Sequence, residues 1–201
     1  MLIDLSHTLN EGTPVYPGDP RMKLNKSGTM DKDGYEDYFI SMPMHMGTHM
    51  DAPAHMIKGG KKITEFSVEH FSGRGVYVNA TEGFNLEELK NKEIKEGDIV
   101  FFHTGMGKMY FQPEYYKSYP DIPEEVVNFL VEKKIKIVGM DMASPDRHPF
   151  LMHKILLKNN ILIIENLTNL DKLAGKKFKV YAFPLKFELD GSPLRVVAET
   201  L

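Results

Sequence analysis

Hydrophobic residues in this chain gather into short runs that are separated by turn-forming residues. The runs at 99–102 and 161–164 are apolar without polar alternation, as strands buried on both faces of a sheet are, and 135–140 is a further strand with a short apolar run. Segments 2–9 and 38–42 also have the composition of strands. The remaining strands are predicted at 74–80, 180–184 and 194–198, with Asp190-Gly191 forming a turn before the last one.

Helical periodicity is confined to a few segments between these runs. Residues 86–91 follow Asn85, a good N-cap, with Glu88 at the capping-box position. Pro123 fits the first position of a helix over 123–134, whose apolar residues share one face. A helix at 150–159 and a short helical turn at 171–174 complete the set. The pattern predicts a single α/β domain spanning residues 1–201, built on a mixed sheet with packed helices.

Composition narrows the class of protein. The chain has 201 residues, 42% of them hydrophobic and 26% charged, as in ordinary globular proteins. A net charge of −3 favours neither nucleic acid nor an anionic membrane as a partner, and no apolar run is long enough for a membrane span. The N-terminus lacks the features of a signal peptide, so we expect a cytoplasmic protein. Because the chain has no Cys, any metal must be bound through nitrogen and oxygen.

The strongest chemical signal is a cluster of imidazoles and a carboxylate. His45, His49, Asp51 and His55 lie within eleven residues, although the whole chain has only eight His. Neutral imidazole and carboxylate are the usual protein ligands for Zn²⁺, Mn²⁺ and Fe²⁺. Gly47 and Pro53 disfavour a long helix, so we expect a tight loop or one short helical turn that directs these side chains to one point.

A second set of candidate ligands follows from the buried run at 161–164. Glu165 comes directly after it, and a carboxylate at the end of a buried strand needs a cation or a hydrogen-bonding shell. His153 lies on the preceding helix, and a helix followed by an adjacent strand can bring the two side chains together. These residues are therefore candidates to join the His cluster.

Three further features have both a structural and a functional interpretation. The loop at 11–20 contains Tyr16, which either belongs to a plain turn or forms a wall of the substrate pocket. His103 ends a predicted strand, where it is either structural or directed at the site. The aromatic segment 105–122 is either a surface loop pinned by its own rings or a lid, and it could reach a partner subunit.

These motifs together resemble the putative cyclase family of metal-dependent hydrolases, which includes bacterial kynurenine formamidases and isatin hydrolases. The most specific of them is the run from His45 to His55, which reads HMGTHMDAPAH. Weaker matches cover nearly the whole chain in the family's order: Tyr16-Pro17-Gly18-Asp19, residues 141–146, His153, residues 165–167, residues 183–185 and residues 190–195.

The resemblance implies a swivelling β/β/α fold, usually in a homo-oligomer. It implies metal ligands at His45, His49 and Asp51, with Asp51 bridging to a second metal held by His153 and Glu165. It also implies His55 as the general acid/base. We expect Zn²⁺, two ions per chain, with Mn²⁺ as the alternative because carboxylates accept it as well.

The expected chemistry is hydrolysis of a C–N amide bond in a small molecule by metal-activated water. N-formyl-L-kynurenine is the leading substrate, and L-kynurenine and formate would be the products. No GxSxG motif occurs, which argues against a serine hydrolase. Three alternatives stay open at this point: hydrolysis of a cyclic amide or imide such as isatin, a non-catalytic metal-binding protein, and a structural domain with an incidental His cluster.

Overall fold

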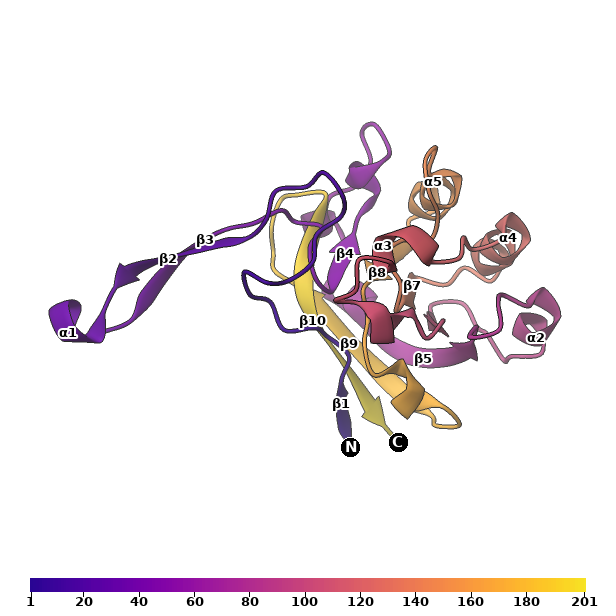
Figure 1. The fold of residues 1–201 in the computed structure, drawn as a ribbon. Helices are drawn as coiled ribbons and strands as arrows, with labels where there is room; N and C mark the ends of the chain where they lie inside the picture. Colours follow the sequence, from indigo (N-terminus) through magenta and orange to yellow (C-terminus); the bar gives the residue numbers. More distant parts are fainter.

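The computed structural model describes residues 1–201 as a curved sheet with helices on one side and a long projecting hairpin (Figure 1). The strands are β1 (Leu2–Asp4), β2 (Lys23–Gly28), β3 (Asp37–Ser41), β4 (His49–Asp51), β5 (Ser72–Asn79), β6 (Ile99–His103), β7 (Ile137–Met140), β8 (Leu162–Glu165), β9 (Phe178–Pro184) and β10 (Gly191–Thr200). The helices are α1 (Met30–Asp33), α2 (Leu86–Lys90), α3 (Tyr115–Ser118), α4 (Glu124–Glu132) and α5 (Leu151–Lys158). None of them is long and apolar enough to cross a bilayer.

Eight strands form one sheet in the order β1-β10-β4-β8-β7-β6-β5-β9. Strand β9 also pairs with β10, so the sheet closes on itself into a barrel-like ring. Strands β5 to β8 are parallel to one another, whereas β4, β9 and β10 pair antiparallel, which confirms the predicted mixed sheet. The fold therefore matches the expected α/β architecture.

The unbroken apolar runs are explained by burial on both faces of this sheet. In β6, Ile99 and Phe101 point to the core inside the ring, while Val100 and Phe102 point to the core beneath the helices. Successive side chains of a strand alternate between faces, so a strand covered on both sides has no polar positions. Helices α4 and α5 supply the outer layer, each with one buried apolar face.

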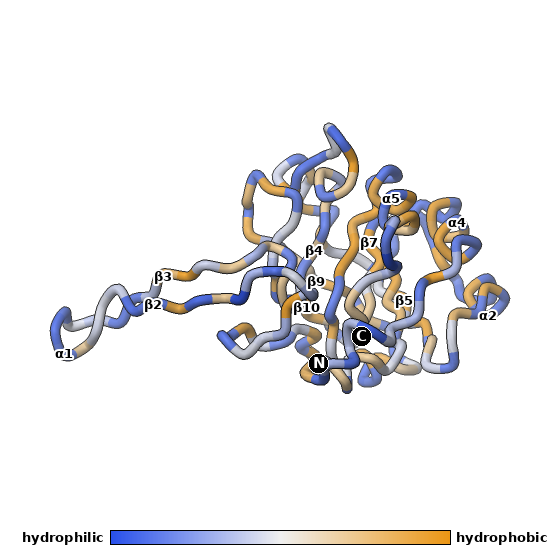
Figure 2. Tube along the Cα trace, turned by 45° about the horizontal axis from the view of Figure 1, so that its top comes forward, coloured by the Kyte–Doolittle hydropathy of each residue, from blue (hydrophilic) through white to orange (hydrophobic).

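The projecting hairpin differs from the sequence prediction. Residues 38–42 were expected to be a sheet strand leading into the His cluster, but β3 pairs only with β2, which the sequence pattern did not predict. All five residues of β3 are exposed, and several apolar ones are visible along the hairpin in Figure 2. Residues 23–41, which we call the arm, therefore lie outside the main sheet.

Helix boundaries were predicted closely. Asn85 caps α2, its side chain accepting a hydrogen bond of 3.1 Å from the Glu88 backbone N–H. Pro123 is the N-cap of α4 instead of its first helical residue, so the helix starts one position later than expected. Segments 63–65, 68–71 and 170–173 form 3₁₀ turns.

Candidate metal centre

Strand β4 places the central part of the His cluster. We expected a loop or helical turn over this segment, but His49–Asp51 is a strand inserted between β8 and β10. Its register sets His49 opposite Glu165 of β8 and Asp51 opposite Gly191 of β10. The site therefore gains its rigidity from the main sheet through β4, while the expected helical turn is a 3₁₀ turn at Pro53–His55.

Two groups of donor atoms converge at this point and share the Asp51 carboxylate. His45, His49 and Asp51 form one group, and Asp51, His153 and Glu165 form the other, with the donor atoms of each group within 4.8 Å of one another. His49 Nε2 lies 3.3 Å from Asp51 Oδ1 and 3.4 Å from Glu165 Oε2. His153 Nε2 lies 3.3 Å from Glu165 Oε1. The structure thus brings together all five residues that the sequence suggested.

The buried imidazoles are held from behind through their other ring nitrogen. His49 Nδ1 lies 2.9 Å from the Gly47 carbonyl oxygen, and His153 Nδ1 lies 2.6 Å from Asp146 Oδ1. Metal-binding His residues are commonly oriented in this way, because an acceptor at one nitrogen leaves the other free to donate its lone pair. The donor set therefore fits a divalent cation with nitrogen and oxygen ligands.

Asn166 reinforces this arrangement. Its side chain donates a hydrogen bond of 2.9 Å to the same Gly47 carbonyl that contacts His49. The Tyr115 hydroxyl in turn donates to Asn166 Oδ1 over 2.7 Å. Gly47 has a φ of +63°, where a Cβ would lie 2.2 Å from the Leu9 side chain, so a larger residue would displace the carbonyl.

The electrostatics of the metal-free site favour positive charge. Burial lowers the pKa of His153, but hydrogen bonds to Asp146 and Glu165 outweigh it and raise this pKa to about 9. Burial likewise opposes protonation of His49, yet Asp51 and Glu165 hold its pKa well above the usual value. Burial would raise the pKa of Asp51, but His49 and His45 keep it well below its ordinary value. The acidic side chains around these two imidazoles thus favour positive charge there, as they would favour a bound cation.

The other half of the site lies closer to solvent. The rings of His45 and His55 stack with centroids 3.9 Å apart. Asp190 contacts both, with its Oδ2 atom 3.0 Å from His45 Nε2 and 3.3 Å from His55 Nδ1. His45 Nδ1 also lies 2.7 Å from Asp51 Oδ1, so this half is joined directly to the buried half.

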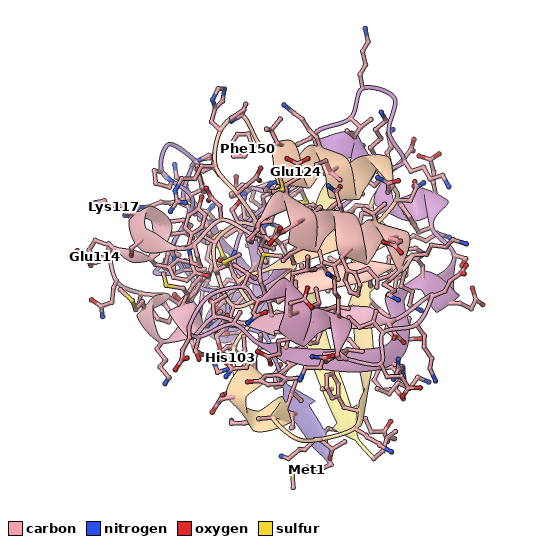
Figure 3. All side chains as sticks on the ribbon, turned by 90° about the vertical axis from the view of Figure 1, so that its right-hand side faces the viewer. Met1, His103, Glu114, Lys117, Glu124 and Phe150 are labelled. Carbon is pink, nitrogen blue, oxygen red and sulfur yellow. The ribbon has the colours of Figure 1, made fainter.

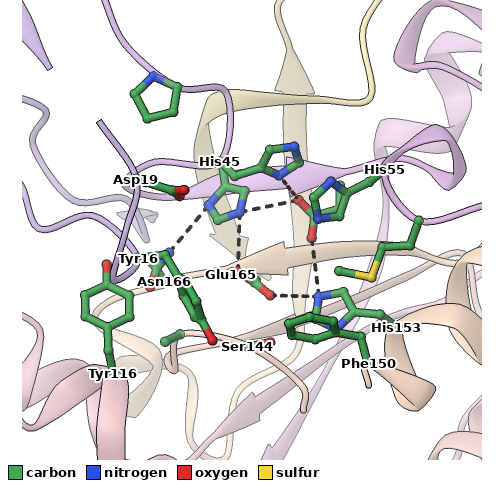
Figure 4. A pocket seen from close by; sticks show the side chains of 15 residues that line it. Tyr16, Asp19, His45, His55, Tyr116, Ser144, Phe150, His153, Glu165 and Asn166 are labelled. Carbon is green, nitrogen blue, oxygen red and sulfur yellow. Dashed lines mark hydrogen bonds and ion pairs between the residues drawn. The ribbon is translucent and has the colours of Figure 1, made fainter. Parts of the chain in front are cut away.

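A cavity of about 350 Å³ opens onto these groups (Figure 4). That volume lies within the range of small-molecule sites. Tyr16, Tyr116 and Phe150 contribute aromatic surface to its wall, and Tyr16 meets Tyr116 edge-on with ring centroids 5.8 Å apart. Tyr16 therefore lies where the pocket interpretation expected it.

Two site residues were missed by the sequence interpretation. Both lie in segments that match the family, 190–195 and 141–146, but no role was given to either: Asp190 was assigned to a turn and Asp146 to a loop. A signal for Asp190 is present next to it, since a Cβ on Gly191 would lie 2.6 Å from the His45 ring, and only glycine permits that approach. No sequence pattern marks Asp146. Its carboxylate meets His153 only because the chain turns between residue 146 and the start of α5.

His103 and the aromatic segment 105–122 have other surroundings. The Tyr77 hydroxyl lies 2.8 Å from His103 Nδ1, and His103 is absent from the cavity wall. Figure 3, viewed from the helical side, shows it far below Phe150. In segment 105–122, Tyr110, Tyr115 and Tyr119 are buried in the chain's own core, and Tyr116 reaches the cavity. The segment therefore contributes one residue to the cavity wall and three tyrosines to the hydrophobic core.

Comparison with known proteins places this centre in a family. The model of the family described as Putative cyclase matches residues 3–147. An uncharacterised protein of Methanocaldococcus jannaschii is 34% identical to this chain, and the match covers 98% of each. A kynurenine formamidase of Bacillus cereus is 30% identical, covering 97% of this chain and 95% of its own.

Solved structures agree with these relatives. Isatin hydrolase A from Labrenzia aggregata, bound to benzyl benzoate, superposes with a TM-score of 0.87 at 27% identity, covering 98% of this chain and 93% of its own. A predicted metal-dependent hydrolase from Bacillus stearothermophilus gives a TM-score of 0.78 at 27% identity, covering 98% and 97%. The similarity therefore extends over nearly the whole fold.

Proposed function

We propose that this chain, which belongs to the Putative cyclase family and is a metal-dependent amide hydrolase, is an arylformamidase acting on N-formyl-L-kynurenine. The observation that carries the proposal is a binuclear-type donor set beneath an aromatic cavity, with the His55 ring stacked on His45 beside it. Similarity to kynurenine formamidases at about 30% identity supports the same substrate class. Membership of an enzyme family also disfavours a non-catalytic metal-binding protein or an incidental His cluster.

In this proposal the two donor groups, which share Asp51, would hold two divalent cations, Zn²⁺ or alternatively Mn²⁺. His45 and His49 complete the first group, and His153 and Glu165 the second. Bound cations supply Lewis acidity, which polarises a carbonyl and lowers the pKa of water. The chain's contribution is to fix these donors through β4, β8 and α5 so that they need no rearrangement.

His55 is the proposed general acid/base. Its ring stacks on His45 at the cavity wall, and Asp190 contacts its Nδ1 atom, leaving Nε2 available for proton transfer. Nε2 takes a proton from the attacking water as the water oxygen bonds to the formyl carbon. The same proton then passes to the aryl nitrogen as the C–N bond breaks, giving formate and an arylamine. Asp190 orients the ring and stabilises its protonated form.

The substrate is tested with purified, metal-quantified protein and two compounds. We expect two metal ions per chain and hydrolysis of N-formylkynurenine, followed by the absorbance of kynurenine. Isatin is the second candidate, favoured by the TM-score of 0.87 to isatin hydrolase A. Turnover of isatin alone would replace the formamidase proposal with cyclic amide hydrolysis, and a metal-loaded protein inactive on both would refute each of them.

We also propose a homo-oligomer, for which the arm provides support. Tyr38, Phe39 and Ile40 are 44%, 64% and 51% exposed on a hairpin with no other strand beside it. An isolated two-stranded hairpin is only marginally stable in water. A groove of about 660 Å³, lined by Ile40 and by residues of segments 42–48 and 185–195, adjoins the arm. Covering by a second copy would bury these surfaces.

Light scattering on a sizing column tests the assembly. The chain has a mass of 23.0 kDa, so an oligomer gives at least twice that value. Phe39→Glu on the arm is expected to reduce the mass to that of one chain, whereas Glu82→Gln on the exposed surface leaves it unchanged. A wild-type protein that elutes as a single chain at micromolar concentration contradicts the proposal.

A further inference from the structure

Away from the metal centre and its imidazoles, the charge on the wall of the active-site cavity is acidic. Besides Asp51 and Glu165 of the metal centre, the cavity wall contains one ionisable carboxylate, Asp19, and no Lys or Arg. Asp19 is exposed on the Tyr16-containing loop, near the mouth shown in Figure 4. Its side chain takes part in no hydrogen bond or ion pair, whereas the carboxylates of Asp51 and Glu165 both contact imidazoles.

Local structure fixes Asp19 beside the aromatic wall. Its backbone N–H donates a hydrogen bond of 3.0 Å to the Tyr16 carbonyl, which closes the turn at Pro17 and Gly18. The Tyr16 ring packs edge-on against Tyr116 across the cavity mouth. An aryl group bound between the metal centre and these rings would therefore present its substituents to Asp19.

The chemistry of this wall distinguishes substrates by charge. A carboxylate substituent would meet Asp19 with no Lys or Arg on the wall to neutralise it, and like charges placed together repel. A protonated amine would pair with Asp19, and the faces of Tyr16 and Tyr116 also favour a cation. Neutral substituents would gain neither contact.

We propose that Asp19 is a specificity-determining residue that binds a protonated amine on the side chain of an aromatic amide substrate. The enzyme then prefers aryl formamides that carry an ammonium group over those that carry only a carboxylate. This inference rests on the proposed formamidase function, and it gives Asp19 a role in selection and none in bond breaking.

The test compares three aryl formamides that differ in which charged groups their side chain carries. They are N-formylkynurenine, its decarboxylated analogue N-formylkynuramine, and its deaminated acid analogue. The variants are Asp19→Asn, Asp19→Glu and, as a matched control, Asp171→Asn, which removes an exposed carboxylate remote from the cavity. Binding of the corresponding products to the metal-loaded protein, measured by calorimetry, reports on charge selection without turnover.

We expect wild-type kcat/KM to be highest for the amine and lowest for the acid, with most of the difference in KM. Asp19→Asn should reduce the ratio of amine to acid by about fivefold, the size expected for an exposed ion pair, and Asp19→Glu should restore much of it. The ratio should also fall with added salt, since screening weakens exposed pairs. Asp171→Asn should match the wild type.

The possible failures separate the two proposals. If no formamide is hydrolysed but the product amine binds more tightly than the acid, and this preference disappears in Asp19→Asn, the formamidase proposal fails and charge selection by Asp19 stands. If formamides are hydrolysed with the same amine-to-acid ratio in wild type and Asp19→Asn, the role of Asp19 is overturned while the formamidase function holds.

Discussion

The two halves of the metal centre use the same side-chain types in opposite surroundings. The side chains of His49, His153, Asp51 and Glu165 are 3%, 3%, 1% and 9% exposed, whereas those of His45, His55 and Asp190 are 22%, 25% and 39% exposed. The buried half takes its positions from β4, β8 and α5. The outer half depends on bends, a 3₁₀ turn and the start of β10.

This difference suggests a division of labour. Buried donors locked by backbone and carboxylate partners can hold a cation with little rearrangement. A half-exposed imidazole has the access to water and the freedom that proton transfer requires. We therefore expect changes in the buried half to act through metal content, and a change at His55, which belongs to neither of the donor groups that share Asp51, to act through turnover.

The largest expected effect comes from the buried half. Glu165→Gln removes a carboxylate that contacts both His49 and His153, so the second donor group loses one of its two negative charges and much of its affinity for a cation. We expect fewer metal ions per chain and a fall in kcat/KM of about a thousandfold or more, since metal stabilisation of the transition state contributes several kcal/mol. Elemental analysis and steady-state kinetics measure the two effects.

The control is Glu188→Gln, which lies outside the cavity wall and contacts only Lys62. It should keep both metal content and rate. Full metal content together with normal turnover in Glu165→Gln would remove this residue from the centre and break the division between the halves.

His55→Ala tests the outer half. Loss of a general acid/base commonly reduces turnover by about 10²–10⁴-fold, and here it should do so with metal content unchanged. A reduced slope in the pH profile of kcat would accompany the loss. His70→Ala, at a half-buried site away from the cavity, should leave both quantities as in the wild type. Metal loss in His55→Ala would instead make this residue a ligand.

The position of each site residue in the chain explains whether it could be predicted from the sequence. His45, His49, Asp51 and His55 are close in the chain, so their convergence is visible in the spacing alone. Glu165 is visible because a charge after an unbroken apolar run must have a partner. Asp190 reaches the site from the far end of the chain through the β4–β10 pairing, which no local pattern encodes.

The prediction of the fold from the sequence was limited in a similar way. Strands buried on both faces and capped helices have strong local signals, and they were predicted with small boundary errors. Strand β4 was missed because three residues with a polar pattern, HMD, are stabilised as a strand only by β8 and β10 on either side. Residues 38–42 were assigned to the sheet because an apolar run does not reveal whether its partner is the core or a hairpin.

Asp146→Asn tests how the buried half orients one of its metal-binding imidazoles. The Asp146 carboxylate orients His153 from behind without contacting the proposed cation positions. Replacing it with an amide should weaken metal affinity by about 10–100-fold, as expected for an outer partner of a metal-binding His. Titration with a competing chelator measures the change. Asp121→Asn, which pairs with Arg147 on the surface, is the control, and equal affinities for all three proteins would contradict the role of Asp146.

The smallest effect is expected from pH in the metal-free protein. The pKa of His153 is raised from 6.5 to about 9 in the folded state, so its protonated form stabilises the fold fully below pH 6.5 and ever less as pH rises toward 9. The pKa of His49 is also raised in the folded state, so its protonation likewise stabilises the fold at low pH and less as pH rises. We expect the melting temperature of chelator-treated protein to fall by about 5 °C between these limits.

Metal reverses this trend, because it requires deprotonated imidazoles and therefore binds more tightly at high pH. The difference in melting temperature between metal-loaded and metal-free protein should accordingly grow from pH 6.5 to 9. His153→Gln removes the titrating group and should flatten the metal-free curve. A wild-type curve that is already flat, or one that rises with pH, would show that the buried imidazoles are neutral without metal. The buried and outer halves of the metal centre would then differ only in their access to water.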